Sequence, residues 1–96
     1  MAFKVLGKDK IDKFARKHPQ SRQPLLAWQA EALAADWQTP QDIKDRHASA
    51  SFLSNNRVIF NIKGNDYRLV VRAFYKRGHL VVEWVGTHAD YDKQVF

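Results

Sequence analysis

The 96-residue sequence contains no cysteine, so neither disulfide bonds nor thiolate metal sites can hold the fold, and a reducing compartment is allowed. It has no apolar run long enough to span a bilayer, and its first eight residues lack the pattern of a signal peptide. We therefore expect a cytoplasmic protein without membrane contact. Repeats and low-complexity segments are also missing, and the length suits one compact domain, which we assign to residues 1–96.

Acidic residues are scarce, because 10 Asp and Glu stand against 16 Lys and Arg and leave a net charge of +6. This balance favours a polyanionic partner, since each phosphate that Lys or Arg neutralises releases condensed counterions. Residues 1–22 carry seven Lys and Arg against two acids, and residues 57–96 carry seven against four. The alternative is a solvated surface that only keeps the protein soluble.

The first half of the chain predicts a short strand at residues 3–6 followed by helices. Asp9 is expected to cap the first helix and Pro19 to stop it, and Ser21 is expected to cap the second. Thr39-Pro40-Gln41-Asp42 predicts an N-cap, a first-turn proline and an acid at the third position of a third helix. The second helix has an apolar stripe at helical spacing that we expect to be buried, formed by Leu26, Ala30, Leu33, Ala34 and Trp37.

From residue 57 the hydrophobic period changes to two, which predicts three strands at residues 57–63, 67–75 and 79–85. Short turns between them indicate an antiparallel meander. Leu69, Val71 and Ala73 should share one face of the middle strand. The other face should mix cations with apolar side chains, namely Arg68, Val70, Arg72 and Phe74. We expect an α+β fold in which the N-terminal strand and two or three helices pack on one face of an antiparallel three- to four-stranded sheet.

Most aromatic residues are expected in the core. We expect Tyr67 and Trp84 in the core because their strands face the helices. We expect Trp28 and Trp37 there because they lie on apolar helix stripes. Tyr91 differs, because it lies close to His88 at the end of the chain, where it can stack on a base.

The segment from Thr87 to Lys93 follows the last strand and predicts a short helical turn with His88 at its N-terminus. A neutral imidazole there suits a general base, and Asp92 four residues later can orient the ring. Metal-free RNA cleavage needs such a group beside cations, since the 2′-hydroxyl attacks the neighbouring phosphate. The alternative is that His88 and Asp92 only pair at a helix end.

Further cations can hold RNA without reacting. Arg68 and Arg72 point the same way from one strand about 13 Å apart, so they can contact successive phosphates or pair with Glu83. Arg57 on the preceding strand is a further candidate for RNA binding, and the first helix can add Lys13, Arg16 and Lys17.

No cofactor is expected. His18, His47, His79 and His88 show no metal-ligand spacing, and neither a glycine-rich phosphate loop nor a nucleophile elbow occurs.

Several stretches resemble the HigB toxins of bacterial type II toxin–antitoxin systems. They are His18-Pro19-Gln20, the tryptophans near residues 28–37, the segment Asn61-Ile62-Lys63-Gly64-Asn65-Asp66-Tyr67-Arg68-Leu69-Val70 and the segment Gly86-Thr87-His88-Ala89-Asp90-Tyr91-Asp92-Lys93. The similarity runs from about residue 4 to residue 93. It implies a RelE-like domain that cleaves messenger RNA on the ribosome.

The resemblance also implies a HigA-type antitoxin with a helix-turn-helix domain, through which alone the complex would reach operator DNA. Contacts to ribosomal RNA are expected from the first 22 residues. The motif positions carry over five candidate catalytic residues, Lys63, Arg68, His88, Tyr91 and Lys93. Within that set we assign phosphoryl charge to Arg68 and Lys63, proton transfer to His88 and base stacking to Tyr91.

Two other functions stay open from the sequence. A non-catalytic RNA- or ribosome-binding module would use the same cations and aromatic residues without breaking a bond. A protein-binding domain would use the open sheet face and would have no affinity for nucleic acid.

Overall fold

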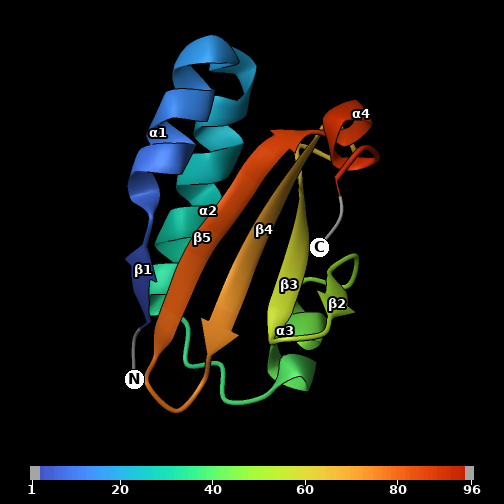
Figure 1. Ribbon diagram of the computed structural model, residues 1–96. Coiled ribbons are helices and arrows are strands. Elements are labelled where there is room, and N and C mark those ends of the chain that lie inside the picture. Colours follow the sequence, from blue (N-terminus) through green and yellow to red (C-terminus); the bar gives the residue numbers. More distant parts are fainter. Residues whose placement is uncertain (1–2, 95–96) are drawn as a thin grey trace.

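The computed structural model describes residues 3–94. After a short first strand, helices occupy most of the first half of the chain, and the remaining strands lie in the second half, as Figure 1 shows. The elements in chain order are β1 (Lys4–Leu6), α1 (Lys8–Lys17), the 3-10 turn η1 (Pro19–Ser21), α2 (Arg22–Ala34), α3 (Pro40–Arg46), β2 (Ser51–Leu53), β3 (Arg57–Ile62), β4 (Tyr67–Phe74), β5 (His79–Thr87) and α4 (His88–Tyr91). No helix within this range is both long and apolar enough to cross a membrane.

The sheet has five strands in the order β1-β5-β4-β3-β2. The predicted meander is confirmed, because β3, β4 and β5 pair antiparallel in sequence. The prediction of three to four antiparallel strands was incomplete. β1 joins β5 in parallel, as its long helical connection to the meander permits, and the three-residue β2 is too short to give a readable alternation. The fold is α+β with the helices against a mixed sheet.

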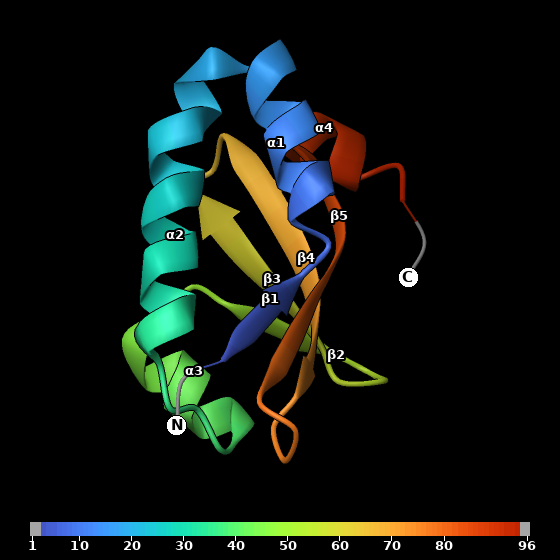
Figure 2. The ribbon, with the colours of Figure 1, turned by 90° about the vertical axis from the view of Figure 1, so that its left-hand side faces the viewer.

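The helices α1, α2 and α3 lie on one side of the sheet, whereas α4 lies on the other, as Figure 2 shows. The core fills the space between helices and sheet. Trp28 of α2 meets Phe60 of β3 edge to face with ring centroids 5.3 Å apart. Tyr67 is buried against Phe14 at 5.5 Å, so the expectation of a core position for Tyr67 is confirmed. This packing fixes the face on which β4 presents its arginines.

The buried face of α2 differs from the predicted one. Leu25, Trp28 and Ala32 are buried, whereas Leu26 and Leu33 of the expected stripe are 42% and 39% exposed. The helix also ends at Ala34, so Trp37 enters the core from the following connection. Two apolar stripes overlap on this helix, and helical spacing alone does not say which one faces the sheet.

Helix starts were predicted with mixed success. Thr39 and Asp42 form the expected capping box at α3, and the Thr87 side chain accepts from the Asp90 N–H at α4. The predicted Asp9 cap was wrong, because the N-cap of α1 is Gly7 with φ 83°. A Cβ on Gly7 would lie 2.8 Å from the Val82 carbonyl oxygen, so close packing on β5 places the helix start there.

A β-bulge in β5 overturns the expected position of Trp84. Val71 pairs with Val82 and Val70 pairs with Trp84, so Glu83 is an extra residue in the strand. Strict alternation would turn Trp84 towards the helices. The bulge instead places Glu83 and Trp84 on the open face that Val70 occupies, and Trp84 is only half-buried.

Candidate functional site

The candidate site lies where β4 begins and β5 ends. Arg68 is opposite Gly86 in the antiparallel register. Gly86 is the next-to-last residue of β5, which α4 follows directly. The His88 N–H donates to the Asp66 carbonyl at 3.2 Å, which ties the start of α4 to the β3–β4 turn. Residues twenty positions apart therefore meet at one end of the sheet.

His88 contacts a cation on one side of its ring and a carboxylate on the other. Its Nε2 lies 2.9 Å from the Arg68 Nη2, and its Nδ1 lies 3.4 Å from the Asp92 Oδ2. A guanidinium can only donate, so these partners assign Nε2 as the acceptor. In the neutral ring the proton is then on Nδ1, the nitrogen that faces Asp92. The basic lone pair of the ring therefore points at Arg68.

Arg68 also packs on Tyr91, with its Cζ 4.7 Å from the ring centroid. Tyr91 in turn lies 6.0 Å from the Trp84 ring. The Arg68 Nε is buried and has no hydrogen-bond partner among the described residues. We call Arg68, His88 and Tyr91 the imidazole cluster. Since a guanidinium has five N–H groups and one faces His88, this cluster retains donors for a phosphate.

A second group of cations follows on the same sheet face. Arg57 and Arg72 are cross-strand partners, and both meet Glu83. The Arg57 Nε lies 2.8 Å from one Glu83 oxygen, and the Arg72 Nη2 lies 3.3 Å from the other. We call these three residues the carboxylate cluster. Its net charge is +1, so one carboxylate offsets half of its positive charge.

The other predicted catalytic residues lie apart from the imidazole cluster. Lys63 has a left-handed φ of 53°, and its Nζ lies 3.5 Å from the Gln20 Oε1 and 3.8 Å from the Asp66 Oδ2. Lys93 is exposed just after α4. The structure thus joins Arg68, His88 and Tyr91 but does not bring the two lysines into contact with them.

The predicted RNA-binding residues of α1 are exposed on the helical side of the molecule. Lys13, Arg16 and Lys17 all lie on the surface of α1. Arg16 alone of the three lines a hollow between α1 and α2. These cations therefore occupy a surface separate from the imidazole cluster.

Sequence reasoning missed the roles of Trp84 and Gly86. A Cβ on Gly86 would lie 2.4 Å from the Trp84 ring, so the ring covers this glycine directly. Trp84 thereby lies beside Tyr91, with ring centroids 6.0 Å apart. A glycine inside a strand was the available signal, because it often marks a close approach. The bulge that brings Trp84 there leaves no comparable trace in the sequence.

No set of three or more His, Asp and Glu side chains in the described part of the chain is arranged to hold a metal ion. The site holds a guanidinium and a phenol, which can donate to an anionic oxygen, beside an imidazole whose Nε2 accepts. The chemistry that this arrangement supports is phosphate binding beside a proton acceptor.

Helices on one face of a sheet and a cationic, imidazole-bearing end on the other are the arrangement of a RelE-like protein. The chain belongs to the HigB toxin family, described as the RelE-like toxic component of a toxin–antitoxin system, whose profile matches residues 21–94. The match covers the imidazole and carboxylate clusters and begins after α1. No individual curated protein matches the chain. Membership makes an antitoxin the implied partner.

Proposed function

We propose that this protein is a ribosome-dependent endoribonuclease toxin that cleaves messenger RNA in the cytoplasm and thereby inhibits translation. A HigA-type helix-turn-helix antitoxin would neutralise it and connect it to operator DNA. The observation that carries the proposal is the 2.9 Å contact between the Arg68 guanidinium and the His88 Nε2 in a member of the HigB toxin family.

The contact supports a metal-independent reaction. The messenger phosphate draws the Arg68 N–H groups to its oxygens, which frees the His88 Nε2 to take the proton of the 2′-hydroxyl. The 2′-oxygen bonds to phosphorus, the bond from phosphorus to the 5′-oxygen breaks, and that oxygen takes a proton from solvent. The products are a 2′,3′-cyclic phosphate and a 5′-hydroxyl.

The neighbours of these two residues have supporting roles. Asp92 keeps the His88 Nδ1–H in place, because its carboxylate faces that side of the ring. Tyr91 packs on Arg68 and lies near Trp84, and we assign it to contact a base beside the scissile phosphate. We assign Lys63 and Lys93 to flanking phosphates, since both are exposed near the ends of this site.

The openness of the site supports dependence on the ribosome. The His88 side chain is 41% exposed, and Glu83 already engages both arginines of the carboxylate cluster. Few groups are left to orient a free RNA strand, and orientation is a large part of catalysis. A message held on the ribosome supplies that orientation, with Lys13, Arg16 and Lys17 contacting ribosomal RNA.

The test compares two histidines near opposite ends of β5, which differ in their surroundings. His88→Ala should reduce message cleavage in a reconstituted translation system by about 100-fold or more, the usual worth of a general base. His79→Ala is the matched control, because His79 lies at the opposite end of β5. Cleavage is mapped from the new 5′-ends, and circular dichroism checks the fold.

Two results would contradict the proposal. One is full cleavage by the folded His88→Ala variant. The other is wild-type protein that binds RNA and ribosomes but neither shortens messages nor arrests growth, which would indicate a non-catalytic RNA-binding module.

A further inference from the structure

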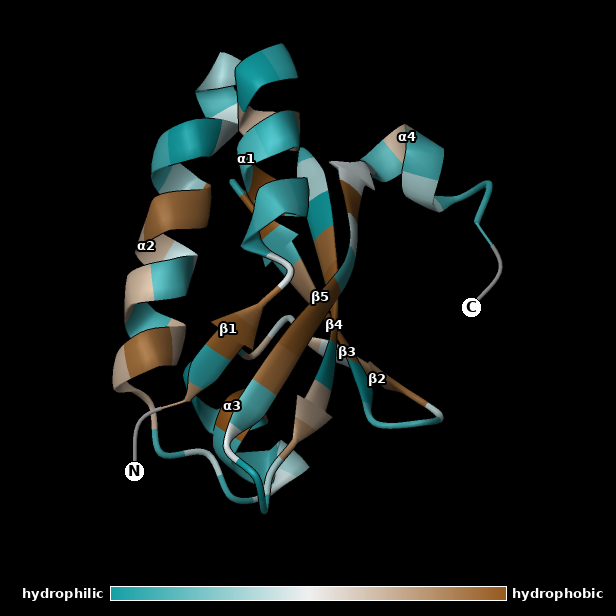
Figure 3. Ribbon diagram, turned by 60° about the vertical axis from the view of Figure 1, so that its left-hand side comes forward, coloured by the Kyte–Doolittle hydropathy of each residue, from teal (hydrophilic) through white to brown (hydrophobic). Residues whose placement is uncertain are grey.

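The outer flank of α2 carries an apolar ridge formed by Leu26, Ala30, Leu33 and Ala34, all exposed. Leu26 and Leu33 are seven residues apart, so they lie on the same flank, two helical turns or about 10.5 Å apart. Figure 3 shows hydrophobic residues along the side of α2 that faces away from the sheet. Single exposed leucines are ordinary, but a continuous apolar line marks an interaction surface.

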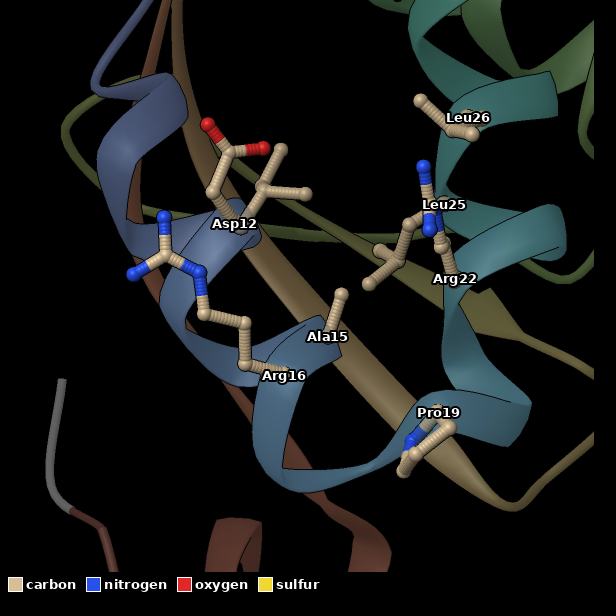
Figure 4. A pocket seen from close by; sticks show the side chains of 8 residues that line it. Asp12, Ala15, Arg16, Pro19, Arg22, Leu25 and Leu26 are labelled. Atoms are coloured by element: carbon tan, nitrogen blue, oxygen red, sulfur yellow. The ribbon is translucent and has the colours of Figure 1, made fainter.

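A hollow between α1 and α2 continues this ridge. Its volume is about 450 Å³, and Leu26 belongs to both the ridge and the hollow. Figure 4 shows Ala15 and Arg16 of α1 across the hollow from Arg22 and Leu25 of α2. The floor is apolar and the rim is charged, which is the form of a groove that accepts an amphipathic helix.

The rim of this groove is cationic. Arg16 and Arg22 flank it, with Asp12 as the acid beside them. Neither arginine forms an ion pair within residues 3–94, unlike Arg57 and Arg72 on the sheet. Lys13 and Lys17 of α1 do not line the groove. Charge complementarity therefore calls for an occupant with carboxylates as well as apolar side chains.

Two other occupants fit less well. RNA would satisfy the arginines but would leave the leucines of the ridge in contact with water or sugar phosphate. A second copy of this chain would bring cationic rims together, and each copy carries a net charge of +6.

We propose that the α1–α2 groove and the α2 ridge together bind an amphipathic, acidic helix of the antitoxin. Apolar side chains two turns apart on that helix cover Leu26 and Leu33, and its carboxylates meet Arg16 and Arg22. The inference rests on the antitoxin partner that family membership implies, not on the nuclease activity. Figures 2 and 3 place this surface and α4 on opposite sides of the molecule.

The probe is a purified HigA-type helix-turn-helix antitoxin, titrated calorimetrically into toxin variants. Leu33→Asp and Arg22→Glu should each weaken binding at least tenfold. Leu53→Asp should change it less than threefold, since Leu53 on β2 is 38% exposed, close to the 39% of Leu33, but lies outside the surface. Arg22 is an exposed residue at the start of α2, so its variant keeps the test valid if Leu33→Asp fails to fold.

Two further measurements complete the test. Single-stranded RNA affinity and sedimentation velocity are recorded for the same variants. Unchanged antitoxin affinity, a loss of RNA affinity alone, or the dissociation of a toxin dimer would each overturn the proposal. Tight antitoxin binding by His88→Ala is expected, so failure of the nuclease proposal and failure of this one are distinguishable.

Discussion

The imidazole cluster and the carboxylate cluster occupy the same sheet face and use the same residue type, yet they differ in what holds the arginine. Arg68 donates to a neutral ring and packs on Tyr91, whereas Arg57 and Arg72 share the Glu83 carboxylate. An arginine beside a neutral acceptor keeps its full charge for a phosphate. An arginine beside a carboxylate must exchange one anion for another, so its partner decides how strongly it attracts RNA.

The largest expected effect tests directly whether the two clusters differ in function. Arg68→Ala should lower message cleavage by about 100-fold or more, because the donors that stabilise charge on the phosphoryl oxygens are lost. Arg72 lies four residues after Arg68 on the same face of β4. Arg72→Ala should lower message cleavage less than about tenfold. Cleavage rates in a reconstituted translation system measure both. Equal losses in the two variants would mean that the two clusters do not differ in function.

A smaller effect should follow when the carboxylate is neutralised. Glu83→Gln keeps the size of the side chain but removes its charge, so Arg57 and Arg72 gain attraction for phosphate. The slope of log affinity for single-stranded RNA against log salt should steepen by about 0.7 for each cation that engages. Fluorescence anisotropy at several salt concentrations measures this slope. An unchanged slope would indicate that the cluster does not contact RNA.

The same change should cost little stability. The ion pairs of Glu83 are partly exposed, and such pairs contribute about 0 to 1 kcal/mol. Urea unfolding of Glu83→Gln and wild type measures the difference. A loss well above that range would show that Glu83 has a structural role beyond its charge.

The smallest expected effect concerns His47, which contrasts with His88 because it lies among the rings of Trp37 and Phe60. Burial lowers the pKa of His47 below its ordinary 6.5, more than the nearby Glu31 raises it. The unfolded state therefore binds the proton more readily. Stability is greatest above pH 6.5 and falls as the pH drops through 6.5 towards the lowered pKa.

His47→Phe keeps the aromatic contacts but removes the titration. Its free energy of unfolding should depend less on pH between 5 and 7.5 than that of the wild type, as urea unfolding at several pH values measures. Parallel pH profiles of the two proteins would contradict this assignment.

Local sequence signals predicted much of the site. The change of period at residue 57 predicted the meander, and Thr87 with Asp90 predicted the turn that carries His88. These succeed because strand alternation and helix capping depend on neighbours in the chain. The resemblance to HigB toxins also led to the correct family.

Two of the errors concern the face that an element presents. The apolar stripe of α2 was assigned to the core, although Leu25 and Trp28 fill it and Leu33 is exposed. Trp84 was assigned to the helix side, although the bulge at Glu83 turns it to the open side. In each case the element was correctly identified, but its orientation depended on partners distant in the chain.

The sequence by itself determined most of the elements, the excess of positive charge and the residues available for chemistry, because these depend on composition and local spacing. Only the tertiary structure decided which arginine meets the imidazole, which meets the carboxylate and which apolar stripe stays exposed. The physical reason is that strand register, the bulge and helix packing are set by contacts between residues far apart in the chain. Such contacts fix the distances on which hydrogen bonds and ion pairs depend.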